Sequence, residues 1–154
     1  MVQNTKSNNY QDLIRELINK IDPAAAVSIA PIVGSTINIS VKAEDANILI
    51  GQAGETLLEI QHLIKTIINK TSKETVYIDL DINDYKKKKA DYLKQLARIS
   101  ADEVSLTKRM KILAPMSAYE RRIIHLELAN REDIATESIG QGVSRKIIIK
   151  PRSF

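Results

Sequence analysis

The stretch that decides the fold of the second half of the chain is Met116-Ser117-Ala118-Tyr119-Glu120-Arg121-Arg122-Ile123-Ile124-His125. Ser117 and Glu120 have the spacing of a capping box, so a helix is predicted to begin here. Arg121 and His125 lie four residues apart and therefore share one face of that helix. A guanidinium offers forked, permanently charged donors for phosphate and a flat surface for a base. This pair is a candidate nucleic-acid contact; an ordinary pair of surface residues is the alternative.

Alternating helices and strands are predicted around this helix. The pattern gives a helix over 83–107 capped by Asn83, a strand over 109–113, a helix over 117–130, and strands over 134–138 and 144–150 around Gly140-Gln141-Gly142. The second module is thus α-β-α-β-β. Arg145 and Lys146, on the last predicted strand, are candidates for flanking phosphate contacts. Arg122 is a further candidate, whose direction on the helix the pattern leaves open.

The first half of the chain carries a Gly-x-x-Gly turn between two predicted helices. Gly51 and Gly54 enclose Gln52 and Ala53, and a glycine lets the backbone of a ligand come close because it has no Cβ. Amides at the start of the following helix carry partial positive charge, which suits phosphate. The surrounding elements, in order, are a helix over 10–21, strands over 27–33 and 36–41 joined at Gly34-Ser35, helices over 43–50 and 55–69, and a strand over 75–82.

This α-β-β-α-α-β order around the turn, over about residues 10–82, resembles a type II KH domain. The resemblance implies that Gly51, Gln52, Ala53 and Gly54 clamp the backbone of about four unpaired nucleotides. KH loops that bind well commonly carry a basic residue between the glycines, whereas Gln52 and Ala53 are neutral and Glu55 follows the turn. We therefore predict weak binding by this module, or a degenerate KH domain used for protein contacts.

The second half resembles the Arg-x-x-x-His (R-three-H) nucleic-acid-binding domain over about residues 84–151. The resemblance rests on Arg121 and His125 followed by Thr136-Glu137-Ser138, Gly140, Gly142 and Arg145-Lys146. A KH domain followed directly by this domain is similar to the bacterial Jag family of SpoIIIJ-associated, KhpB-like RNA-binding proteins. The resemblance implies that Arg121 and His125 bind the nucleic acid. It also implies a role in post-transcriptional control, linked in some members to cell elongation and division.

The expected organisation is α+β with two small domains. The KH domain is assigned to residues 10–82 and the R-three-H domain to residues 83–151, with a disordered N-terminus at 1–9 and a short tail at 152–154. Members of the Jag family often carry an extra N-terminal domain, and here about nine polar residues precede the first predicted helix.

Charge and composition separate the two halves and exclude several classes of function. Residues 1–80 hold seven Lys/Arg and nine Asp/Glu, a net charge of −2, whereas the remainder holds sixteen and ten, a net charge of +6. A polyanion is therefore attracted mainly to the second half. The chain has no cysteine, no apolar run near the ~18 residues of a membrane span, and no P-loop, HExxH or paired-carboxylate pattern. We expect a cytoplasmic protein without membrane insertion, cofactor, metal or enzymatic activity.

Three hypotheses for the function follow. The first is binding of single-stranded RNA through both modules, with most of the affinity in the second. The second is a protein-interaction adaptor whose KH surface has lost nucleic acid, which the neutral Gln52 and Ala53 favour. The third is a preference for single-stranded DNA. A KH-domain protein or a second copy of the chain is a further candidate partner.

Overall fold

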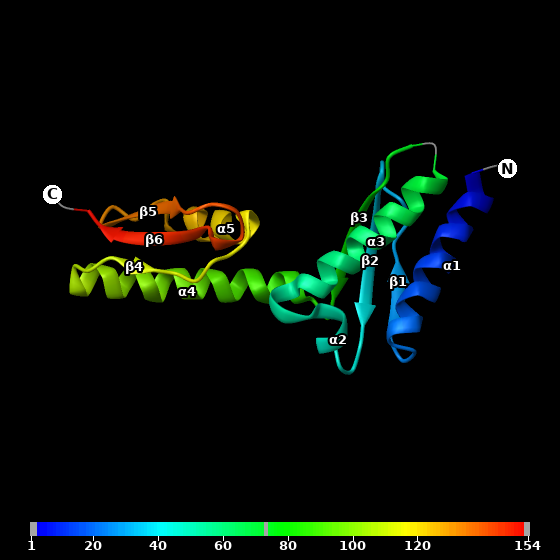
Figure 1. Cartoon of the computed structure of the whole chain (residues 1–154), viewed down its shortest axis with the longest axis horizontal. Helices are drawn as coiled ribbons and strands as arrows, with labels where there is room; N and C mark the ends of the chain where they lie inside the picture. Colours follow the sequence, from blue (N-terminus) through cyan, green and yellow to red (C-terminus); the bar gives the residue numbers. More distant parts are fainter. Residues whose placement is uncertain (1–2, 73, 153–154) are drawn as a thin grey trace. The chain divides into compact units, whose positions relative to one another are not determined.

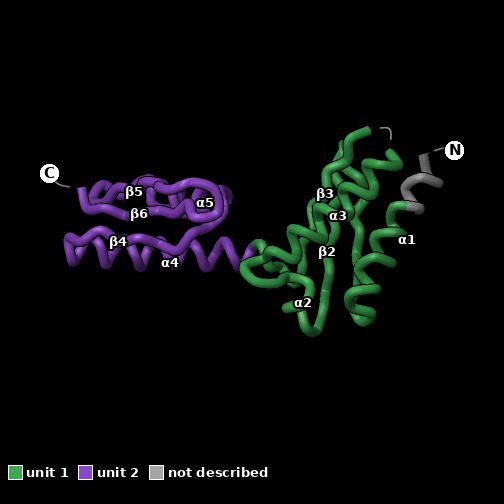
Figure 2. Tube along the Cα trace, in the orientation of Figure 1, with its two compact units in different colours: residues 1–86 green, residues 87–154 purple. Residues whose placement is uncertain are grey.

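The computed structural model describes residues 3–72 and 74–152. Residues 1–2 of the expected disordered N-terminus and 153–154 of the expected tail lie outside this description. The chain divides into two compact units, residues 1–86 and 87–154 (Figure 2). Each unit packs helices against a three-stranded sheet, so the predicted α+β class is confirmed.

The first unit has the predicted α-β-β-α-α-β order (Figure 1). Its elements are α1 (Gln3–Ile21), β1 (Ala26–Ile29), β2 (Thr36–Lys42), α2 (Asn47–Ile50), the 3-10 turn η1 (Gln52–Gly54), α3 (Glu55–Thr71) and β3 (Tyr77–Ile82). The strand order is β1-β2-β3. Strands β1 and β2 form the predicted antiparallel hairpin, while β3 runs parallel to β2.

One face of this sheet carries the core of the first unit. Burial alternates along β2 and β3, as expected for strands with one covered face. Apolar side chains of α1 and α3 pack against the buried strand residues, which makes a core of aliphatic residues. The fully buried members include Ile14, Ile18, Ile64, Ile68, Ile37, Ile39, Val41, Leu80 and Ile82.

Several elements of this unit differ in length from the prediction. Helix α1 begins at Gln3, so residues 3–9 are helical where disorder was expected. They continue the predicted amphipathic helix toward the N-terminus, because each residue added to a formed helix gains a hydrogen bond. Strand β1 ends at Ile29 rather than Val33, because Pro31 has no amide to donate to a ladder. Helix α2 covers only Asn47–Ile50.

Asn83 does not cap the next helix as predicted. Its side chain accepts a hydrogen bond from the amide of Ala43 (3.1 Å) and donates to the carbonyl of the same residue (2.7 Å). The amide and the carbonyl of Ala43 are both engaged by the Asn83 side chain, so Ala43 does not take part in α2, which starts later than predicted. The carboxylate of Asp81 instead accepts from the amide of Lys86 (3.2 Å) at the start of α4 (Tyr85–Thr107).

The second unit follows the predicted order of helices and strands. After α4 come β4 (Lys111–Ile112), α5 (Ala118–Leu128), β5 (Ile134–Ile139), the 3-10 turn η2 (Gly142–Ser144) and β6 (Lys146–Pro151). The strand order is β4-β6-β5, and both pairings are antiparallel. The core joins one face of α4 to α5 and to the sheet. Its buried residues are Leu93, Ala97, Ala101, Val104, Leu113, Ile124, Leu128, Ile134, Ile147 and Ile149.

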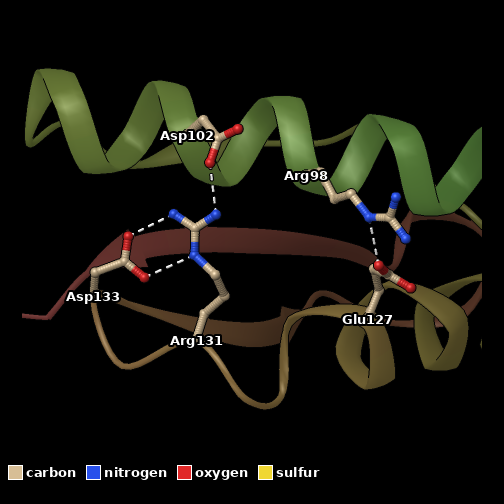
Figure 3. Close-up of polar contacts among 5 residues, drawn as sticks. All are labelled: Arg98, Asp102, Glu127, Arg131 and Asp133. Atoms are coloured by element: carbon tan, nitrogen blue, oxygen red, sulfur yellow. Dashed lines mark hydrogen bonds and ion pairs between the residues drawn. The ribbon is translucent and has the colours of Figure 1, made fainter.

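Ion pairs tie α4 to the segment around α5 (Figure 3). Arg131 donates to Asp102 on α4 (2.6 Å) and to both carboxylate oxygens of Asp133 (2.8 and 2.5 Å). Arg98 on α4 donates to Glu127 on α5 (2.6 Å). The pKa of Asp133 is held well below its usual range, first by Arg131 and then by Ser105. The ionised Asp133 therefore stabilises the folded protein at pH values above the ordinary Asp pKa. This stabilisation is lost as the pH falls through the lowered pKa of Asp133.

Within the described residues, none of the helices is both long and apolar enough to cross a membrane. Among the same residues, no group of three or more His, Cys, Asp or Glu side chains is placed so that it could hold a metal ion.

Candidate nucleic-acid interface

The start of α5 has the predicted capping box. The Ser117 hydroxyl accepts from the amide of Glu120 (3.3 Å), and the Glu120 carboxylate accepts from the amide of Ser117 (2.7 Å). The same carboxylate pairs with Lys89 of α4 at 3.3 Å. The acidic side chain nearest in sequence to Arg121 is therefore committed to the helix start and to α4.

Basic residues from α5 and from the turn before β6 line one open hollow, which we call the cationic pocket. Its lining consists of Ala118, Arg121, Arg122, His125, Leu126, Ser138 and Arg145. None of these lining residues, all within the described part of the chain, is acidic. Three guanidinium groups and an imidazole thus converge without a carboxylate to neutralise them, which favours an anionic ligand.

Arg121 is held by the backbone of the loop that precedes α5. One terminal nitrogen, Nη1, donates to the carbonyl of Met116 at 2.6 Å. The amide of Met116 in turn donates to the carbonyl of Arg145 (3.2 Å), which links the two sides of the pocket. Because a guanidinium has five N–H donors, this anchor orients the group and leaves donors for a ligand.

His125 lies one helical turn from Arg121, as predicted, and is half-buried. Its Nδ1 lies 2.6 Å from the hydroxyl of Thr136 on β5. Burial, and secondarily the charge of Arg121, lowers the pKa of His125 below its usual value. This shift favours the neutral form of the ring. When the Thr136 hydroxyl donates to Nδ1, the ring proton is on Nε2, and Nε2–H is the donor left for a ligand.

Two of the three flanking candidates line the pocket. Arg122 is exposed and lies in the lining, which answers the question of its direction on the helix. Arg145 also lines the pocket, but it precedes β6 rather than lying on it, because residues 142–144 form a 3-10 turn. Its Nε donates to the Ser138 hydroxyl (3.1 Å). Lys146 is the first residue of β6, pairs with Ile139, and is not in the lining.

The Gly-x-x-Gly turn of the first unit has a different character. Gln52 and Ala53 are exposed, whereas Gly54 is buried. A Cβ on Gly54 would lie 2.9 Å from a ring carbon of Tyr85. The lack of a side chain at Gly54 therefore lets the ring of Tyr85 pack against it. Of the four residues predicted to contact nucleic acid, Gln52 and Ala53 are the exposed ones. The turn brings no basic side chain, so attraction for phosphate rests on backbone amides.

The residues that orient the pocket are the part that sequence reasoning missed. Thr136 and Ser138 were noted as parts of a motif but received no role. They are two residues apart on β5, so both side chains lie on one face of the strand. There they bond His125 and Arg145, respectively. Leu126 was missed as well, although its position four residues after Arg122 places it on the same helix face.

The fold of the second unit and its cationic pocket agree with the comparison to known protein families. Residues 91–151 match the R-three-H domain, so the chain is an R-three-H-domain protein. The match begins within α4 and ends at the last residue of β6, and it contains every residue of the cationic pocket.

The chain is homologous to proteins named RNA-binding protein KhpB, which confirms the family predicted from the sequence. It is 39% identical over 112 residues to that of Clostridium symbiosum, 36% over 105 residues to that of Lactiplantibacillus plantarum, and 34% over 116 residues to that of Bacillus subtilis. These alignments cover 73%, 68% and 74% of this chain, but 50%, 33% and 56% of the relatives. The chain thus matches about half or less of the length of most of these relatives.

Proposed function

We propose that the chain binds single-stranded RNA and that the cationic pocket of the second unit makes the main contact. The observation that carries this proposal is the convergence of Arg121, Arg122, Arg145 and His125 in a lining without acidic residues. Its chemistry suits a phosphate of an unpaired strand. The KhpB relatives are named RNA-binding proteins, which supports RNA as the ligand.

The first unit has an accessory role in this proposal, as a KH domain with a weakly binding loop. Its element order and its Gly-x-x-Gly turn support the assignment. The exposed neutral residues Gln52 and Ala53 favour the second candidate function, in which this unit contacts a KH-domain protein or a second copy of the chain. We further propose a cytoplasmic, non-enzymatic regulator of bacterial RNAs, with cell elongation and division among the processes affected.

The Arg145→Gln variant tests the main contact. Arg145 is exposed and lines the pocket, so the loss of one phosphate contact should lower the slope of log K against log salt by about 0.7. The measurement is fluorescence polarisation of the full chain with a labelled single-stranded RNA at several salt concentrations. The matching DNA oligomer at one fixed salt concentration tests the preference for RNA.

Arg109→Gln is the matched control for this variant because it removes the same charge outside the pocket. Arg109 is exposed and lies just beyond Thr107, the last residue of α4. Thr107 is roughly 27 Å along that helix from Lys89 at a rise of 1.5 Å per residue. Its slope should equal that of the parent chain. Equal slopes for Arg145→Gln and the parent chain would reject the pocket as the phosphate site.

RNA affinity is expected to rise as the pH falls. The pKa of His125 is lowered in the free protein, and a phosphate beside the ring raises it again, so binding takes up a proton. Affinity should be constant well above the pKa of the bound form, rise as the pH falls through it, and level off below the lowered pKa of the free form. Polarisation titrations at constant ionic strength, from about pH 8 to about pH 5, span the range in which histidine titrates. The His125→Gln variant should remove the pH dependence; a dependence that persists unchanged contradicts a contact to this ring.

A further inference from the structure

The exposed face of α5 carries apolar side chains beside the cationic pocket. Tyr119 and Leu126 are 66% and 64% exposed, although the same helix buries Ile124 and Leu128 completely or nearly so. Single exposed apolar residues are common on protein surfaces. These two differ in their location, because Leu126 lines the pocket and Tyr119 directly follows Ala118, which also lines it.

Helical spacing places Arg122 between these two side chains. Tyr119 precedes Arg122 by three residues and Leu126 follows it by four, so the three share one face on consecutive turns. A guanidinium has a flat surface that stacks on aromatic rings and on bases. The tyrosine, the guanidinium and the leucine thus lie along one face of α5 beside the cationic pocket.

We propose that Tyr119, Arg122 and Leu126 form a platform for an unstacked base of the strand whose phosphate lies in the cationic pocket. This inference rests on the proposed function. Each nucleotide carries its phosphate and its base on opposite sides of a sugar, so a strand anchored by phosphate in the pocket presents bases outside it. The adjacent platform offers the ring and the aliphatic surface on which proteins stack unpaired bases.

The charge around the platform selects this occupant over an apolar peptide. The platform adjoins a lining that contains three arginines and one histidine, which favours a ligand that combines negative charge with a flat apolar group. A single-stranded nucleic acid has both properties in every residue. Because every base has a π-face, the platform is expected to tolerate many sequences.

The Tyr119→Ala variant in the full chain tests the platform. Affinity for a short oligouridine should fall by about 5- to 140-fold, the range that corresponds to the loss of one stacked base. The slope of log K against log salt should stay that of the parent chain, because a neutral ring releases no counterions. Tyr119→Phe should bind like the parent chain. An abasic strand of the same length should bind the parent chain and Tyr119→Ala equally.

Tyr92→Ala is the matched control, since Tyr92 is 58% exposed on α4 of the same unit and does not line the pocket. It should bind oligouridine like the parent chain. Parent-like binding by Tyr119→Ala, or an equal loss in Tyr92→Ala, overturns the platform while leaving the pocket in place. A parent chain that binds no single strand rejects the proposed function and the platform together. Circular dichroism of each variant confirms that the helices are retained.

Discussion

The Gly51→Ala variant is expected to lower the free energy of unfolding of the first unit by about 2–4 kcal/mol. Gly51 has φ 71° and ψ −175°, a region of backbone conformation that is essentially restricted to glycine. A Cβ at this position would lie 2.1 Å from Oγ1 and 2.7 Å from Cβ of Thr56, and 3.0 Å from its amide nitrogen. A rotation of the threonine side chain leaves its Cβ and its backbone in place, so the chain itself has to shift.

Chemical denaturation followed through amide signals of residues in the first unit measures this effect. Gly34→Ala is the matched control, because Gly34 also has positive φ (63°) but has nothing within 4 Å of its missing Cβ. The control carries only the backbone penalty, about 1–2 kcal/mol. Equal losses in the two variants would mean that Thr56 yields without cost and would contradict the steric argument.

The two glycines of the Gly-x-x-Gly turn are poor positions at which to test for an RNA contact. Gly51 is closed in by Thr56 and Gly54 by Tyr85, so the fold requires both glycines before any ligand binds. A bulky or charged residue at Gly54 therefore disturbs packing, and lost RNA binding in such a variant would not identify a contact. Gln52 and Ala53 are exposed, and substitutions there address the ligand directly.

The double variant Arg121→Ala with His125→Ala is expected to bind single-stranded RNA at least about tenfold more weakly. A hydrogen bond to a charged group contributes about 1.5–3 kcal/mol, and tenfold corresponds to about 1.4 kcal/mol. The two losses are not expected to add fully, because the side chains are neighbours. The measurement is a polarisation titration at fixed pH and salt, since both alter the contribution of these groups.

Circular dichroism has to confirm that this double variant is folded, because Arg121 also holds the carbonyl of Met116. Arg15→Ala with His62→Ala removes the same groups from exposed positions in the first unit and should leave affinity close to that of the parent chain. Arg121→Lys keeps the charge but loses the forked donor, so an intermediate affinity is expected. Parent-like affinity in a folded Arg121→Ala/His125→Ala protein would reject the pocket as the main contact.

Local patterns in the sequence were sufficient for the order of elements and for the helix face that carries Arg121 and His125. The capping box at Ser117 and Glu120 depends only on neighbours three residues apart, and it forms as predicted. The pairing of Arg121 with His125 follows from the pitch of a helix. These features are determined by the geometry of residues three or four apart, which does not depend on the tertiary structure.

Contacts between distant residues were decided by the tertiary structure alone. Asn83 pairs with Ala43, forty residues away, instead of capping α4. Thr136 orients His125 across eleven residues, and Arg145 enters the pocket because its turn returns to Met116. Hydrophobic periodicity reports which residues are buried, but it does not report which polar groups then meet, because any donor brought near a free acceptor satisfies it equally well.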